Sequence, residues 1–169
     1  DKKIPSIFIG SGSNLLVWDE GFDGVVISLR KTFNKLTINS NSSIIVQSGV
    51  MLGTMVKEAI KKQICGLESL VGVPGTVGGA LIMNAGAFGG EISSYFIEAK
   101  TMTKKGNVRT YSKQDIQFSY RHSTFPPDEI LIEATIQCKK GNRDIILNDK
   151  KNASHLRKTT QPLKYRSAG

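Results

Sequence analysis

The chain has 169 residues, of which 39% are hydrophobic and 22% charged, a balance typical of a folded globular protein and not of a disordered segment. No apolar run approaches the ~20 residues that a membrane-spanning helix needs, so we expect no membrane span. The first residues contain neither an initiator methionine nor an apolar signal core. They indicate a protein that is not exported and a chain that begins partway into a longer reading frame.

The formal charge is +9, and much of it lies late in the sequence. Residues 139–166 hold nine basic side chains against two acidic ones. A basic field of this kind attracts nucleic acid, a membrane surface or phosphate-bearing small molecules. Aromatic residues are not interleaved with the basic ones, which disfavours a stacking surface for single strands. Among the partners that a basic field attracts, nucleic acid is therefore disfavoured. A basic nucleic-acid-binding module stays as a weaker alternative, and we expect no nucleic-acid partner.

The two cysteines, Cys65 and Cys138, are far apart in sequence and belong to no paired motif. One possible bridge in a chain of this size is weak support for an oxidising compartment, so we predict two reduced thiols and a cytoplasmic location. Neither cysteine stands in a ligand-like spacing with histidine or a carboxylate, and we predict no metal site.

The first half of the chain reads as several short strands and one helix. Apolar runs predict strands at 6–9, 15–18 and 25–27, followed by a hairpin that joins 36–38 to 44–46. The helix is expected over about residues 51 to 63. Its apolar side chains recur at helical spacing, at Leu52, Met55, Val56, Ala59 and Ile60.

The second half adds strands expected at 95–103, 107–111 and 130–138, then a polar helix from about 144 to 158. Neither an internal repeat nor a low-complexity linker interrupts the chain. The pattern as a whole predicts the α+β class, rich in strands and with few helices.

Two glycine-rich stretches, 10–14 and 74–79, stand next to serine, threonine and asparagine. Seven glycines fall within residues 72–90. A glycine backbone can adopt positive φ and approach a ligand closely, and successive exposed N–H groups form a concave site for phosphate. Two such loops favour a ligand with an extended diphosphate, although tight turns and close packing are the alternative for either loop alone.

Neither common nucleotide-binding scaffold fits these loops. Leu15 occupies the third glycine position of a dinucleotide fingerprint, and the next residues read as a strand where a helix would be required. The sequence also lacks the glycine–lysine–serine/threonine pattern of a P-loop.

A second candidate site is the run Phe118 to Ser123. The guanidinium of Arg121 stays charged and offers a rigid set of donors, so it can stabilise a developing anion. Tyr120 and Ser123 could orient that arginine or donate hydrogen bonds. By itself this run would equally suit an arginine in a surface turn.

Taken together, these blocks make the chain resemble the UDP-N-acetylenolpyruvoylglucosamine reductase (MurB) family of flavoproteins. The resemblance covers the whole chain in the family's order and spacing. It is carried by Gly10–Val17 with Asp19–Gly24, by Gly66–Glu91, by Phe118–Ser123, and by Arg157–Leu163 with Ser167–Gly169.

The resemblance implies an FAD-binding fold of the vanillyl-alcohol-oxidase (PCMH) type, with two α+β subdomains around non-covalent FAD. It implies a first subdomain at 1–60, a second at 61–158, and the start of a connection to a substrate domain at 159–169. The family reduces its FAD with NADPH and then reduces the enolpyruvyl group of a UDP-sugar to UDP-N-acetylmuramate, in peptidoglycan precursor synthesis. The UDP-sugar is therefore the expected partner.

The family's functional residues map onto matching positions of this sequence. Arg121 corresponds to the catalytic arginine of a Tyr-Arg-x-Ser motif, with Tyr120 and Ser123 as substrate-binding neighbours. The expected FAD-binding residues are Gly10, Ser11, Gly12, Ser13, Asn14, Leu15, Pro74, Gly75, Thr76, Gly78, Gly79, Ala80, Asn84, Ala85, Gly86 and Gly90.

The match departs from the family at its end. In the family a serine that protonates the intermediate follows Ser-Ala-Gly at once, whereas this chain stops at Gly169. The family's substrate domain and its C-terminal catalytic glutamate also lie beyond that point. We therefore expect the chain to be the flavin-binding portion of the enzyme and to be inactive alone. Another FAD-linked oxidoreductase of the same fold is the alternative, although its flavin loops would often carry the histidine or cysteine of a covalent flavin, which these loops lack.

Overall fold

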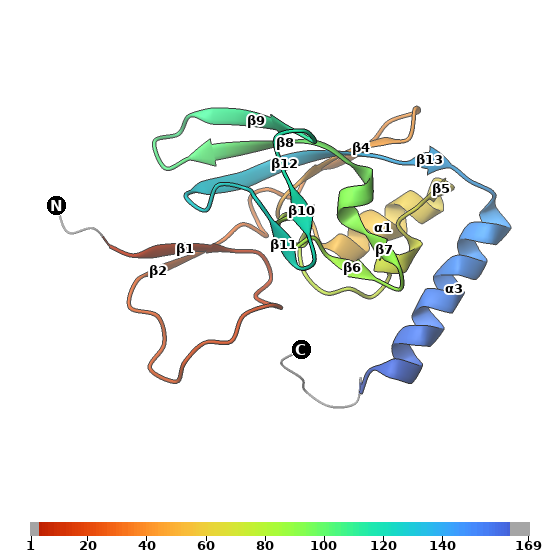
Figure 1. Ribbon diagram of the computed structural model, residues 1–169, viewed down its shortest axis with the longest axis horizontal. Helices are drawn as coiled ribbons and strands as arrows, with labels where there is room; N and C mark the ends of the chain where they lie inside the picture. Colours follow the sequence, from red (N-terminus) through yellow and green to blue (C-terminus); the bar gives the residue numbers. More distant parts are fainter. Residues whose placement is uncertain (1–3, 163–169) are drawn as a thin grey trace.

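The structure, a computed structural model, describes residues 4–162 and is built on a five-stranded antiparallel sheet (Figure 1). The strands lie in the order β3-β4-β12-β8-β9. Their bounds are Leu36–Ile38 for β3, Ser43–Gln47 for β4, Phe96–Thr103 for β8, Val108–Ser112 for β9 and Glu129–Gln137 for β12. The predicted hairpin and the three later strands are therefore confirmed, within one or two residues at each end.

The middle strand β12 joins the two halves of the chain. Its Ala134 lies opposite Val46 of β4 on one side and opposite Ala99 of β8 on the other. All three side chains are buried on the part of the sheet that the helices cover.

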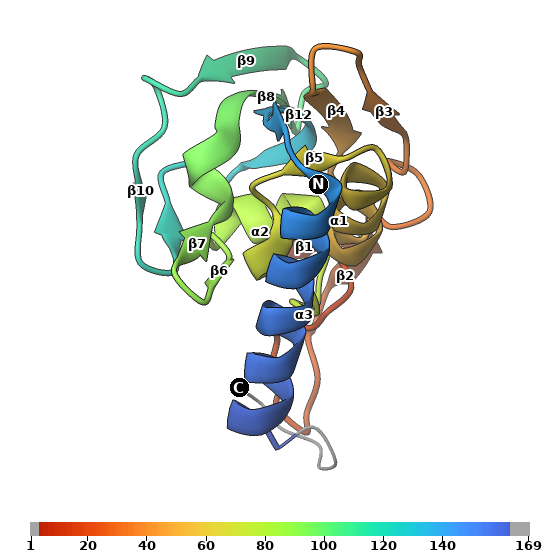
Figure 2. The ribbon, with the colours of Figure 1, turned by 90° about the vertical axis from the view of Figure 1, so that its right-hand side faces the viewer.

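Two helices, α1 (Leu52–Lys61) and α2 (Val77–Ile82), lie beneath the sheet, as Figure 2 shows. The apolar face of α1 is buried, as its spacing predicts, and α2 contacts both β4 and β12. Helix α2 is not expected from the sequence, because two of its six residues are glycines, which disfavour helix. Burial of Val77 and Leu81 and a Thr76 N-cap that accepts from Gly79 N compensate for this.

The third helix, α3 (Arg143–Thr160), lies along one side of the molecule, at the right in Figure 1. Asn142 caps its start by accepting hydrogen bonds from the backbone of Asp144 and Ile145, at 2.8 and 3.3 Å. Ile146 and Ala153 are the side chains that α3 buries. Among the helices of residues 4–162, none combines the length and apolar character needed to cross a bilayer.

Near the N-terminus, β1 (Ser6–Ile9) and β2 (Val25–Ser28) form a separate parallel pair joined by the long loop 10–24 (Figure 1). The strand predicted at 15–18 is wrong. Gly12 and Trp18 begin turns there, with Leu15 N donating to Gly12 O and Gly21 N to Trp18 O. The apolar run pairs with no strand in the described part of the chain, and its side chains are exposed.

Shorter elements complete the chain. Strand pairs link β5 (Ile64–Cys65) to β13 (Lys139–Lys140), β6 (Gly86–Ala87) to β7 (Gly90–Glu91), and β10 (Phe118–Ser119) to β11 (His122–Ser123). Two 3₁₀ helices, η1 and η2, span Glu68–Leu70 and Ile92–Tyr95. The α+β class is confirmed. The division into subdomains at 1–60 and 61–158 stays a prediction. Strand β4 of the first range and strand β12 of the second pair in the same sheet.

Candidate functional site

The two glycine-rich loops, 10–14 and 74–79, meet in space. Gly10 lies so close to Thr76 that a Cβ on Gly10 would overlap the threonine hydroxyl. A Cβ on Gly75 would lie 3.2 Å from Ser13 Oγ. The sequence predicts each loop separately, and the structure brings them together.

Fixed backbone contacts hold the second loop. Leu52 N donates to Gly75 O at 3.0 Å, so α1 begins against this loop. Val77 N donates to Val50 O at 2.8 Å, and Gly78 N donates to Ser48 O at 2.9 Å. Gly78 is buried against Ser48, with no room for a side chain. The loop is therefore anchored to the segment that leaves β4.

The first loop presents free backbone donors. Gly12 has a φ of 74°, and Gly75 across from it has a φ of 118°, both in the region that favours glycine. Within residues 4–162, the N–H groups of Ser11, Gly12 and Ser13 donate to no protein acceptor. Successive free N–H groups of this kind form a concave anion-binding site.

Asn84 links the second glycine block to the candidate catalytic turn. Its side chain is buried, and its Nδ2 donates to Glu91 Oε2 at 2.9 Å and to Ser119 O at 3.0 Å. Its backbone has a φ of 43°, which is uncommon for a residue other than glycine. Its Oδ1 is buried without a partner among the described residues. An unsatisfied buried acceptor costs free energy, so this oxygen is suited to accept from a ligand N–H or O–H.

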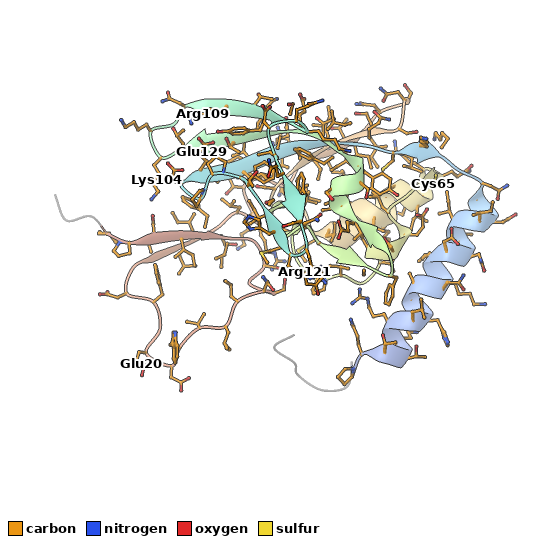
Figure 3. The ribbon with its side chains drawn as sticks, in the orientation of Figure 1. Glu20, Cys65, Lys104, Arg109, Arg121 and Glu129 are labelled. Carbon is orange, nitrogen blue, oxygen red and sulfur yellow. The ribbon has the colours of Figure 1, made fainter. Side chains whose placement is uncertain are left out.

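Arg121 stands at the tip of the β10–β11 hairpin, beside β6 (Figure 3). Its φ is 56°, a conformation that costs energy for a residue with a side chain and that concentrates at functional sites. Nη1 donates to Gly86 O at 3.2 Å, and the guanidinium lies 5.1 Å from the centre of the Tyr120 ring. A fixed cation thus borders residues 72–90, the glycine-rich segment.

The other predicted residues divide into two groups. The first group lies at least partly exposed around the two loops and consists of Ser11, Gly12, Ser13, Asn14, Leu15, Pro74 and Gly79. Tyr120 is 82% exposed. Ser123 is buried, and its hydroxyl donates to Ile82 O at 2.7 Å, which ties β11 to α2. Gly86 and Gly90 leave no room for a Cβ because they pack on Glu91 and Ser69, while Ala80 and Ala85 lie at α2 and its end. Their roles stay predictions.

Sequence reasoning did not single out Glu91, Phe88 or the role of Arg157. Glu91 accepts from Asn84, and Arg157 of α3 lies over the Phe88 ring. The only available signal was their place in the blocks of the resemblance, because contacts between α3 and a loop about 70 residues earlier leave no local pattern. Leu163 and Ser167–Gly169 lie outside the described residues.

A cavity of about 640 Å³ lies elsewhere, between α1 and α3. Val56, Ile60 and Leu147 are among its lining residues, and none of the predicted site residues lines it. The candidate site comprises the two glycine loops where they meet and the turn that carries Arg121, and the buried Asn84 joins the end of α2 to that turn.

These residues fit FAD on three structural grounds. The loops leave no space for a Cβ at Gly10, the first loop offers N–H donors that are free within residues 4–162, and Asn84 Oδ1 lacks a partner in that same range. The diphosphate oxygens of such a ligand would accept from the free N–H groups, and an N–H or O–H of an attached polar ring would donate to Asn84 Oδ1.

Comparison with known proteins agrees with this geometry. The FAD binding domain family matches residues 1–112. The UDP-N-acetylenolpyruvoylglucosamine reductase of Rickettsia typhi is 37% identical over 169 residues, which cover 100% of this chain and 57% of that protein. The chain thus spans little more than half the length of that relative.

Solved structures give the same picture. The crystal structure of UDP-N-acetylenolpyruvylglucosamine reductase (MurB) from Thermus caldophilus superposes with a TM-score of 0.88 at 34% identity, over 99% of this chain and 60% of that one. The 6-hydroxy-D-nicotine oxidase of Arthrobacter nicotinovorans matches at 0.58 and 20% identity, over 81% of this chain and 31% of that one, and supports the fold alone. The predicted resemblance and fold type are confirmed, and the chain belongs to the FAD binding domain family.

Proposed function

We propose that this chain is the FAD-binding part of an NADPH-dependent reductase that converts UDP-N-acetylglucosamine enolpyruvate to UDP-N-acetylmuramate. The observation that carries the proposal is the meeting of Gly10 with Thr76, beside a glycine-rich segment that Arg121 borders. Similarity to named reductases over the whole chain supports the substrate class.

In the proposed reaction NADPH is oxidised to NADP⁺, and the enolpyruvyl double bond gains a hydride and a proton. FAD, when bound, carries the hydride from NADPH to the substrate. The free backbone N–H groups of Ser11, Gly12 and Ser13 would hold its diphosphate, with the 74–80 loop packed beside them. Asn84 Oδ1 would accept a hydrogen bond from the cofactor, which satisfies that buried oxygen.

Arg121 would act on the substrate. Addition of hydride to a double bond conjugated with a carboxylate places negative charge on that carboxylate and the adjoining carbon. A guanidinium fixed by Gly86 O and the Tyr120 ring stabilises such charge without reorganising. Tyr120 would contact the substrate through its exposed ring, while Ser123 would fix the turn from beneath.

The proposal includes a cytoplasmic location and a UDP-sugar as the partner, with no nucleic acid. Cys65 and Cys138 are both free thiols, as expected in a reducing compartment. The basic charge favours the three anionic ligands that this reaction requires.

The test is an assay of the full-length protein loaded with FAD. We expect NADPH oxidation that depends on the enolpyruvyl UDP-sugar. The variant Arg121→Met should keep bound FAD and lose about 10²–10³-fold in kcat, the usual effect of removing one preorganised charge-stabilising donor. Lys105→Met, which removes an exposed cation in the β8–β9 turn, is the matched control.

Two results would overturn this assignment. NADPH oxidation with oxygen and no response to the UDP-sugar would favour another FAD-linked oxidoreductase of the same fold. An unchanged kcat in Arg121→Met would remove that residue from the chemistry.

A further inference from the structure

Arg157, on the last turns of α3, reaches across to the glycine-rich segment. Its Nε donates to Val71 O at 3.2 Å, and its Nη1 donates to Gln161 Oε1 at 2.9 Å. The side chain is half-buried, and this burial lowers the pKa of its guanidinium. Two of its nitrogens, Nε and Nη1, are therefore committed to protein acceptors, whereas the other basic side chains of α3 make no such hydrogen bond within residues 4–162.

The turn at Val71–Gly72 is shaped around this arginine. Gly72 has a φ of 77°, and a Cβ there would lie 2.8 Å from Arg157 Cδ. The arginine stem thus fills the space that a side chain at residue 72 would occupy. Gly72 precedes Pro74 and the loop that meets Gly10, so the position of this turn affects the candidate FAD site.

Arg157 also contacts the opposite end of the glycine-rich segment. Its guanidinium lies 5.5 Å from the centre of the Phe88 ring, within the range of a cation–π contact. Phe88 has a φ of 51°, unusual for an aromatic residue, and forms the tip between β6 and β7. At the start of that hairpin, Gly86 O accepts from Arg121. Two arginines from distant elements therefore hold the same hairpin.

We propose that Arg157 is a positioning residue for FAD binding: it fixes both the 71–73 turn and the Phe88 tip, and so sets the geometry of the loops between them. The proposal rests on the proposed function for the FAD site. Residues held at positive φ, such as Phe88, keep that conformation only where the surroundings impose it. A planar guanidinium holds its Nε–H toward the carbonyl and its plane beside the ring in one fixed geometry, whereas an ammonium is a point charge on a flexible stem and fixes neither.

Helix α3 is suited to this role because its own position is fixed. Asn142 caps its N-terminus, Ile146 and Ala153 are buried, and the helix contacts η1 just before Val71. A side chain from this helix can therefore transmit the position of α3 to the glycine-rich segment.

The test compares Arg157→Met with Arg157→Lys in the full-length protein. We measure the FAD dissociation constant by fluorescence quenching and the shape of the bound-flavin spectrum by visible circular dichroism. Arg157→Met should weaken FAD by about tenfold, which corresponds to about 1.4 kcal/mol, and alter the flavin spectrum. Arg157→Lys should recover part of both, because it keeps a cation over Phe88. Lys158→Met, the same charge change at an exposed neighbouring position, should match the parent.

A second variant links the effect to the ring contact. Phe88→Leu should weaken FAD, and adding Arg157→Met to it should cost less than Arg157→Met costs alone, since coupled residues are non-additive. If Arg157→Met fails to fold, Arg157→Lys and Phe88→Leu give the same comparison.

The inference is wrong if a folded Arg157→Met binds FAD with the parent's affinity and spectrum, or if Lys158→Met produces an equal loss. Absence of FAD binding by the parent itself would instead contradict the proposed function, so the two failures are distinguishable.

Discussion

At the scale of single residues, burial sets the chemistry of Cys138. The thiol is 2% exposed at the edge of the core, and this burial, together with the neighbouring Cys65 and Glu68, raises its pKa to about 12 from an ordinary value of 9.0. Burial disfavours the charged thiolate, so Cys138 stays protonated and unreactive in the folded protein.

This raised pKa predicts a loss of stability at alkaline pH. The unfolded chain releases the Cys138 proton near pH 9 while the folded chain retains it to about pH 12, so the unfolded state binds fewer protons in that window. The free energy of unfolding should therefore be unaffected by this group below about pH 9 and fall by up to ~1.4 kcal/mol per pH unit above it. Denaturant unfolding from pH 7 to 11 measures this.

The variant Cys138→Ala isolates the effect of the thiol. It should be less sensitive to alkaline pH than the parent, and the two stability curves should converge as pH rises. Parallel curves across that range would show that Cys138 does not carry the dependence.

At the scale of elements, the β1–β2 pair and its loop are weakly held by the rest of the described chain. Leu16 and Trp18 are 88% and 84% exposed, and Val25 and Val26 of β2 are about half exposed. A two-stranded unit with so little apolar burial is marginally stable by itself. In contrast, β12 lies in the middle of the sheet with Ala134 and Ile136 buried.

We expect FAD to stabilise this unit more than any other element. Hydrogen exchange of the full-length protein should show residues 6–28 among the least protected without FAD and the most protected by its addition. Residues 130–136 of β12 should be protected in both states. An equal gain in both segments would mean that FAD stabilises the whole molecule uniformly and not through the first loop.

The elements also show how far a sequence can be interpreted. Helix α1 follows from the spacing of its apolar residues, and the β3–β4 hairpin follows from two apolar runs around a polar turn. The run at 15–18 has the same apolar character as a strand, but whether it pairs depends on a partner that local sequence does not specify. Helix α2 depends on tertiary burial that overrides its glycines, so propensity conceals it.

The candidate site is likewise predictable in part from local sequence and in part only from the packing of distant segments. Glycine density predicts the two loops, and the motif around Arg121 predicts the turn; that these residues bind FAD and substrate stays a prediction. The contact between Gly10 and Thr76, the orphaned Asn84 Oδ1 and the reach of Arg157 depend on how distant segments pack. No local pattern encodes such contacts.

At the scale of the whole molecule, the five-stranded sheet brings the site together. The segment leaving β4 supplies Ser48 and Val50, which hold the second glycine loop, and the same sheet carries β8 and β12 beside α2. The first loop then reaches this platform from the β1–β2 pair. The proposed FAD site is therefore the place where these two loops meet.

A visible absorption titration of full-length apoprotein with FAD, for the parent, Gly10→Ala and Gly53→Ala, tests whether the cofactor binds there. The parent should bind FAD non-covalently and release it intact on denaturation. Gly10→Ala should bind about tenfold to a hundredfold more weakly, because overlap with Thr76 costs about 1–3 kcal/mol and separates the loops. Gly53→Ala adds its methyl group in open space on α1 and should match the parent. A folded parent that takes up no FAD, or a Gly10→Ala variant that binds as tightly as Gly53→Ala, would contradict the account.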